Sequence, residues 1–87
     1  MTFSYDDKAD VLYLTFEKSE GKVVYLENSQ GDVLRLDEQS GKVIGCTIIF
    51  FLRRAREGPI LVPEITSVPI NQIANSLISE RKQEKRH

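Results

Sequence analysis

The residue types that most often carry enzyme chemistry are scarce in this chain of 87 residues. The single histidine, His87, is the final residue, where nothing fixes its imidazole, and the single cysteine is Cys46. A nucleophile needs a general base within hydrogen-bond reach. The sequence therefore predicts neither a Ser/His/Asp nor a Cys/His site, and we expect a protein that is not an enzyme, without catalytic residues or a cofactor.

A carboxylate cluster at Asp6, Asp7 and Asp10 is the one group with the character of a metal site. It lacks the twelve-residue loop, central glycine and final glutamate of a calcium-binding hand, and no second cysteine is available for zinc. Short acidic side chains instead favour turns, because they accept hydrogen bonds from their own backbone. We expect a solvated turn and no metal.

Cys46 excludes an internal disulfide and is typical of a reducing compartment. It alternates with Ile44 and Ile48, which predicts a small buried residue on a strand. The longest apolar stretch, 47–52, is far too short to span a membrane. We expect a cytoplasmic protein. The neighbouring Gly45 indicates a bulge or a close backbone approach within that strand.

Charge is distributed unevenly along the chain. Residues 1–49 carry five Lys or Arg against nine Asp or Glu, and residues 50–87 carry seven against four. Arg53, Arg54 and Arg56 lie beside Phe50 and Phe51, and such a combination can stack on bases and neutralise phosphates. The alternative is that both phenylalanines belong to a core or an interface. Nucleic-acid binding is thus left open.

The stretch 5–16 organises the predicted fold. It passes from an acidic turn into six branched, aromatic or leucine residues, a composition that favours an extended strand. Similar runs recur about every ten to twelve residues, with polar turns between them. They predict an α+β protein built on an antiparallel β-meander of four to five strands. The expected strands are residues 1–4, 11–17, 22–27, 32–37 and 42–50.

Alternation along these strands separates two faces. One set is apolar throughout and is predicted to form the core: Leu12, Leu14, Phe16, Val24, Leu26, Leu34, Leu36, Ile44, Cys46, Ile48 and Phe50. The opposite set is too apolar to face only water, so we expect something to cover part of it. It comprises Val11, Tyr13, Thr15, Val23, Tyr25, Val33, Arg35, Val43, Thr47 and Ile49.

After residue 50 the pattern changes. Residues 51–57 fit either a helical turn or the end of a long strand, and residues 60–62 fit a short edge strand. Three prolines between residues 59 and 69 predict an extended arm. Helical spacing then predicts a C-terminal helix from residue 68 or 69 to 82, with Ser67 as its N-cap. We divide the chain into a β-meander domain, 1–57, and an extended arm with its C-terminal helix, 58–87, which either belongs to the same single domain or is a partner-binding tail.

Two segments of the sequence resemble a known family. The pattern Tyr5-Asp6-x-x-Ala9-Asp10-x-Leu12-Tyr13-Leu14 is similar to the opening signature of small bacterial proteins catalogued as domain of unknown function 2283. The run Gly41-Lys42-Val43-Ile44-Gly45, with Arg53-Arg54 beyond it, is similar to the second signature of that family. The resemblance covers residues 5–54.

The resemblance implies a small, mostly antiparallel β domain. It also implies an antitoxin, because members, notably cyanobacterial ones, are often encoded beside a small ribonuclease-like toxin of the RelE type. The chain departs from the usual pattern at Phe50-Phe51, and the segment from Gly58 onward matches no signature. The family defines no catalytic residues that would apply here.

Three functional hypotheses follow. The first is a protein-interaction module, an antitoxin, that binds its partner through the arm and the helix; the residues expected to contact the partner are Ile70, Ile73, Leu77, Arg53 and Arg54. The second is a homodimer that buries the face of Tyr13, Tyr25 and Ile49. The third is a weak nucleic-acid binder with a steep dependence on salt.

Overall fold

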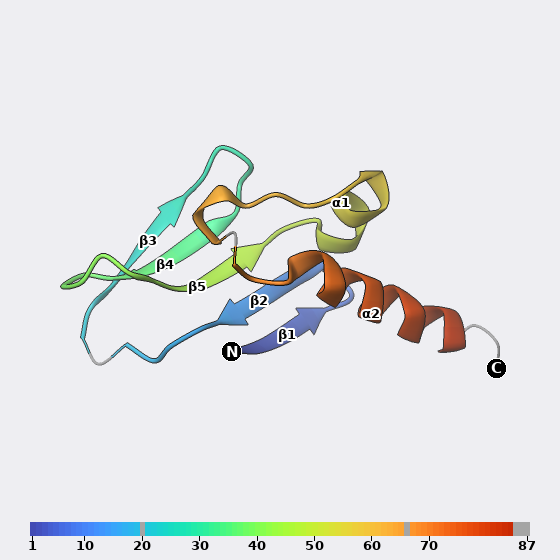
Figure 1. The fold of residues 1–87 in the computed structure, drawn as a ribbon, viewed down its shortest axis with the longest axis horizontal. Coiled ribbons are helices and arrows are strands. Elements are labelled where there is room, and N and C mark those ends of the chain that lie inside the picture. The colour runs from blue at the N-terminus through green and yellow to red at the C-terminus, as the bar shows by residue number, and fades with distance from the viewer. Residues whose placement is uncertain (20, 66, 85–87) are drawn as a thin grey trace. The chain divides into compact units, whose positions relative to one another are not determined.

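A computed structural model describes residues 1–19, 21–65 and 67–84 of the chain, with side-chain burial described as far as residue 80. Its contacts divide the chain into two compact units, Met1–Phe50 and a second unit that begins at Phe51. The division thus falls before residue 57, where the sequence analysis placed it. The elements in chain order are β1 (Thr2–Asp6), β2 (Val11–Thr15), β3 (Val23–Glu27), β4 (Val33–Asp37), β5 (Val43–Ile48), α1 (Phe51–Glu57), a 3₁₀ turn η1 (Pro63–Ile65) and α2 (Ile70–Glu84) (Figure 1).

The first unit is a five-stranded antiparallel sheet with the strand order β1-β2-β5-β4-β3. The predicted α+β architecture is confirmed. Strands β3, β4 and β5 form a meander, but the connection from β2 leads to the far edge of the sheet, so that β2 pairs with β5 and not with β3. As a result β5 is the central strand, and β1 and β3 are the two edges (Figure 1).

The register brings the predicted core residues of the inner strands together. Leu12 and Leu14 on β2 lie opposite Ile48 and Cys46 on β5, and Cys46 also lies opposite Leu34 on β4. Residues directly opposite in an antiparallel pair share a face. All five side chains are buried, as is Ile44, which confirms the alternation over these three strands.

Three predicted core residues are exposed. On β3, Val24 and Leu26 are 45% and 53% exposed, because an edge strand lacks a neighbour on one side. Phe50 is 51% exposed for a different reason. Strand β5 ends at Ile48 and Phe50 adopts a left-handed φ of 49°, so the alternation does not extend to it. Phe16 and Leu36 are half-buried.

The loop between β3 and β4 has the predicted turn chemistry. The Asn28 side-chain oxygen accepts hydrogen bonds from the amides of Gln30 and Asp32 at 2.9 and 3.0 Å. Gly31 follows with a φ of 88°, the conformation for which a glycine was expected there. Asp32 is fully buried, and its carboxylate accepts a hydrogen bond from the amide of Ile49 at 3.3 Å, which ties this loop to the end of β5.

The second unit contains two helices that pack on each other, α1 and α2. Residues 51–57 are therefore a helix and not the end of a strand. Residues 60–62 form no strand, so that prediction was wrong; the backbone of Ile60 is hydrogen-bonded by the side chain of Asn71. Helix α2 begins at Ile70, and Ser67 lies too far upstream to be the N-cap that we predicted. The buried side chains of this unit are Phe51, Leu52, Ile60, Val62, Ile65, Ile70, Ile73 and Ala74.

Candidate functional site

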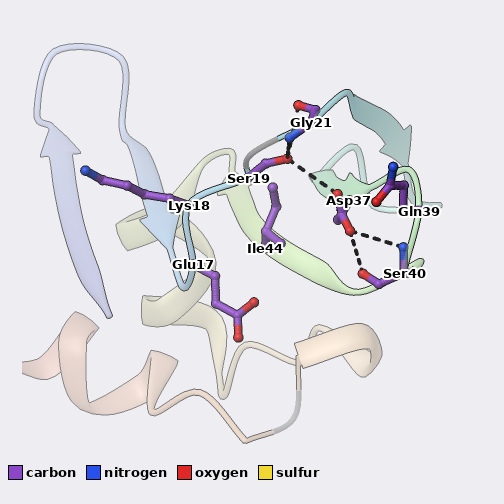
Figure 2. Close-up of a pocket in the computed structure, with 8 residues that line it drawn as sticks. All are labelled: Glu17, Lys18, Ser19, Gly21, Asp37, Gln39, Ser40 and Ile44. Atoms are coloured by element: carbon purple, nitrogen blue, oxygen red, sulfur yellow. Dashed lines mark hydrogen bonds between the residues drawn. The ribbon is translucent and has the colours of Figure 1, made fainter.

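A polar hollow of about 490 Å³ lies in the first unit, between the segment that follows β2 and the turn that joins β4 to β5. Figure 2 shows its lining, with Asp37 reaching toward Ser40 on one side and Ser19 on the other. The lining residues are Glu17, Lys18, Ser19, Gly21, Asp37, Gln39, Ser40 and Ile44. The sequence analysis did not identify this hollow, because its two segments are brought together only by the sheet.

Asp37 is the best-placed acid in the hollow, and the turn uses its carboxylate. One oxygen accepts hydrogen bonds from the Ser40 hydroxyl at 2.8 Å and the Ser40 amide at 3.1 Å. The other is 3.5 Å from the Ser19 hydroxyl. The Ser40 hydroxyl is the main cause that holds the pKa of Asp37 below its ordinary value of 3.8, and slight desolvation opposes it. Asp37 is thus an ionised acceptor that stabilises the turn.

The rim of the hollow carries one exposed ion pair, in which Lys42 Nζ lies 3.6 Å from Glu17 Oε1. Exposed pairs of this kind contribute little to stability. The described lining contains serine hydroxyls but no imidazole or thiol that would act as a base or nucleophile beside them. The arrangement explains a tight turn and offers hydrogen bonds to a ligand, but it assembles no catalytic pair.

The first signature motif is a hairpin between β1 and β2. The Asp6 carboxylate accepts hydrogen bonds from the amides of Lys8 and Ala9, at 3.1 and 3.2 Å, which closes the turn as expected for a short acidic side chain. The Tyr5 hydroxyl donates to the Asp10 carboxylate at 2.6 Å, across the base of the turn. Asp10 itself has a φ of 57°, so the residues that carry the resemblance have structural roles.

Two side chains of the acidic cluster, Asp6 and Asp10, bond within the hairpin. Among the residues that the structure describes, no group of three or more His, Cys, Asp or Glu side chains is placed to hold an ion. The described helices likewise include none that is long and apolar enough to cross a membrane.

The second signature contains a close approach at Gly45. The Arg35 guanidinium crosses β5 above Gly45 and donates to the Leu14 carbonyl and, at 3.2 Å, to the Thr15 hydroxyl on β2. A Cβ atom at Gly45 would lie only 2.7 Å from Arg35 Cζ. A register shift between Arg35 and Leu36 lies beside this point. The predicted close approach and irregularity at Gly45 are both confirmed.

The predicted partner-binding residues lie in the second unit with different accessibilities. Ile70 and Ile73 are buried on α2, at 4% and 7% exposure, and Leu77 is half-buried. On α1, Arg53 is exposed and Arg54 is half-buried. Partner binding by these five residues stays a prediction, as does nucleic-acid binding through the arginines of α1.

The second unit has a hollow of its own, of about 320 Å³, with a mainly apolar lining. Asn71, in the first turn of α2, fixes the arm beside it: its side-chain oxygen accepts from the Ile60 amide at 2.8 Å, and its nitrogen donates to the Ile60 carbonyl at 3.3 Å. The sequence analysis did not identify Asn71, because the sequence shows only a polar residue near the start of a predicted helix. The lining residues are Ile60, Leu61, Val62, Pro63, Ile65, Val68, Ile70 and Asn71.

The fold and these sites together define a small α+β protein with an antiparallel sheet whose polar groups mainly serve turns. A family model described as "Protein of unknown function (DUF2283)" matches residues 2–51, more than half of the chain, and the chain belongs to this family. The match covers the first unit and ends where the second begins. No curated protein and no solved structure matches the chain.

Proposed function

We propose that this chain is a cytoplasmic protein-interaction module, without enzymatic activity, that binds a protein partner through its second unit. The first unit supports this proposal through the use of its polar groups. The hydroxyls of Ser19 and Ser40 both donate to Asp37, and Asp6 and Asp10 bond within the hairpin. The single cysteine, Cys46, is buried, and a lone cysteine is typical of a reducing compartment.

The observation that carries the proposal is the exposure of Leu61. Its side chain is 71% exposed although it borders an apolar hollow of about 320 Å³. The Asn71 side chain bonds the backbone of Ile60, the residue before Leu61, and so ties this part of the arm to α2. An ordered apolar side chain beside an apolar hollow is the arrangement that a hydrophobic segment of a partner fills.

The predicted contact residues divide into two roles under this proposal. Ile70 and Ile73 are buried, so they hold the second unit together, and Ile70 also lines the hollow. Leu77, Arg53 and Arg54 extend the contact surface over α2 and α1. A partner that binds the folded second unit contacts the exposed Leu61 and not the buried isoleucines.

The finer proposal is that the partner is a toxin and the chain its antitoxin. It is supported by family membership, because the resemblance implies proteins encoded beside ribonuclease-like toxins of the RelE type. The second unit lies outside the family match, so it is the part of this chain that we expect to recognise its own toxin.

Co-expression with the product of the neighbouring gene tests the proposal. We expect the two proteins to co-purify, and Leu61→Ser to weaken the complex at least tenfold. Phe3→Ser is the matched control, because Phe3 is also an exposed apolar residue, at 49%, but lies on β1 in the first unit. Failure of the wild-type proteins to associate, or equal loss in both variants, would contradict the proposal.

A further inference from the structure

The edge strand β3 presents an unusual run of exposed apolar side chains. Val24, Tyr25 and Leu26 are consecutive and are 45%, 67% and 53% exposed. β3 is the last strand of the sheet on its side (Figure 1). Soluble proteins usually protect such edges with charges, prolines or bulges. Here the charges are confined to the two ends of the run, Lys22 and Glu27.

The hydrogen bonds beside β3 show which backbone groups face outward. Antiparallel strands bond through every second residue. The amide of Asn28 donates to the Asp32 carbonyl at 2.9 Å, and the amide of Glu38 donates to the Lys22 carbonyl at 3.1 Å. In this register the even-numbered residues of β3 bond to β4. The amides and carbonyls of the odd-numbered residues, 23, 25 and 27, point away from the sheet.

We propose that β3 pairs antiparallel with β3 of a second copy, with the two Tyr25 residues opposite each other. In this register Val23 lies opposite Glu27 of the second copy. The residues whose amides and carbonyls point away from the sheet therefore face one another across the pair. The two-fold axis of such a dimer is perpendicular to the sheet. The face of the sheet that carries the core therefore lies on the same side in both copies. The sheet becomes continuous across both copies.

The side chains of β3 are self-complementary in this register. Val24 lies opposite Leu26 of the second copy, on the face that carries the core, and the two tyrosines pair on the other face. In this register Glu27 lies opposite Val23 of the second copy, so no like charges face each other across the pair. The other edge, β1, suits pairing less well, since Thr2, Ser4 and Asp6 are polar.

A contact between two short strands is small, so we expect a reversible dimer whose formation depends on concentration. This inference rests on the proposed function only in that both treat the chain as an interaction module. The surfaces differ, because Leu61 belongs to the second unit and β3 to the first. Each claim can therefore fail without the other.

Amide hydrogen exchange in the full-length wild-type chain tests the pairing residue by residue. We expect the amides of residues 23, 25 and 27 to become at least threefold more protected as protein concentration rises from about 10 μM to about 1 mM. The amides of Val24 and Leu26 bond to β4 and are expected to be protected at every concentration. Concentration-independent exchange at all three outward amides would overturn the inference.

The variant Tyr25→Pro supplies a second readout. Proline removes an outward-facing amide, which an edge strand tolerates, while the bonds from β3 to β4 remain. We expect it to keep the circular dichroism spectrum and to abolish the rise in light-scattering mass above the 9.9 kDa of one chain. Tyr25→Thr, which keeps the amide, is the control and is expected to retain weaker dimerisation. A folded Tyr25→Pro dimer would contradict pairing through β3.

Discussion

At the scale of single residues, Gly45 is required because of Arg35. The guanidinium group occupies the space that a side chain at residue 45 would fill. We expect Gly45→Ala to displace Arg35 from the Leu14 carbonyl and the Thr15 hydroxyl. The free energy of unfolding should fall by about 1.5 to 3 kcal/mol, the range for lost hydrogen bonds to a charged group. Urea denaturation measures the change.

A double-mutant cycle separates this cause from a general intolerance of the strand. In an Arg35→Ala background the space above residue 45 is empty. Gly45→Ala is then expected to be neutral or stabilising, because alanine loses less backbone entropy than glycine in a strand. The same destabilisation in both backgrounds would show that the Arg35 side chain is not the reason for Gly45.

The Asp37 carboxylate predicts a pH dependence. Because its folded pKa lies below 3.8, its contribution to stability is present above the unfolded pKa and is lost as the pH falls through the folded pKa. Ser40→Ala removes the largest cause of the lowered pKa, so the pKa of Asp37 should rise toward 3.8. An NMR titration of the carboxyl carbon measures it. An unchanged pKa would contradict this assignment, and Ser29→Ala serves as the control.

At the scale of elements, the hairpin between β1 and β2 shows how the opening signature determines local structure. We expect Asp6→Ala to destabilise the protein by roughly 1 kcal/mol, since it removes the acceptor for the amides of Lys8 and Ala9. Lys8→Ala, in the same exposed turn, is the control and should change stability by less. Thermal unfolding followed by circular dichroism compares the two. Equal effects would mean that the Asp6 carboxylate does not stabilise the turn.

The strands and helices also show which features of the fold can be predicted from the sequence. Alternation located the strands, since Leu12, Leu14 and Ile48 need only their own strand pattern to be assigned a face. It failed for Val24 and Leu26, because β3 became an edge only through the long connection that places β5 beside β2. The edge strand expected at residues 60–62 failed because Asn71, distant in sequence, bonds the Ile60 backbone. The polar hollow was missed for the same reason, as Ser19 and Asp37 meet only in the folded sheet.

At the scale of the whole molecule, the chain combines a family-defined sheet with a second unit outside the family match. The proposals assign a different contact to each: β3 of the first unit to a second copy, and the rim around Leu61 of the second unit to a protein partner. With this division, β3 determines the association of two copies of the chain, and the rim around Leu61 determines which protein partner binds. It predicts that substitutions at Leu61 leave self-association unchanged.

Native mass spectrometry of the chain co-expressed with the neighbouring gene product tests this account most directly, because it gives the stoichiometry of the assembly. The account predicts a complex with two copies of each protein, which Tyr25→Pro reduces to one of each. A complex with one copy of each from the wild-type chain that persists as the concentration is raised to about 1 mM would contradict pairing through β3. Detection of this chain only by itself, with no partner bound, would contradict the central claim that it is an interaction module.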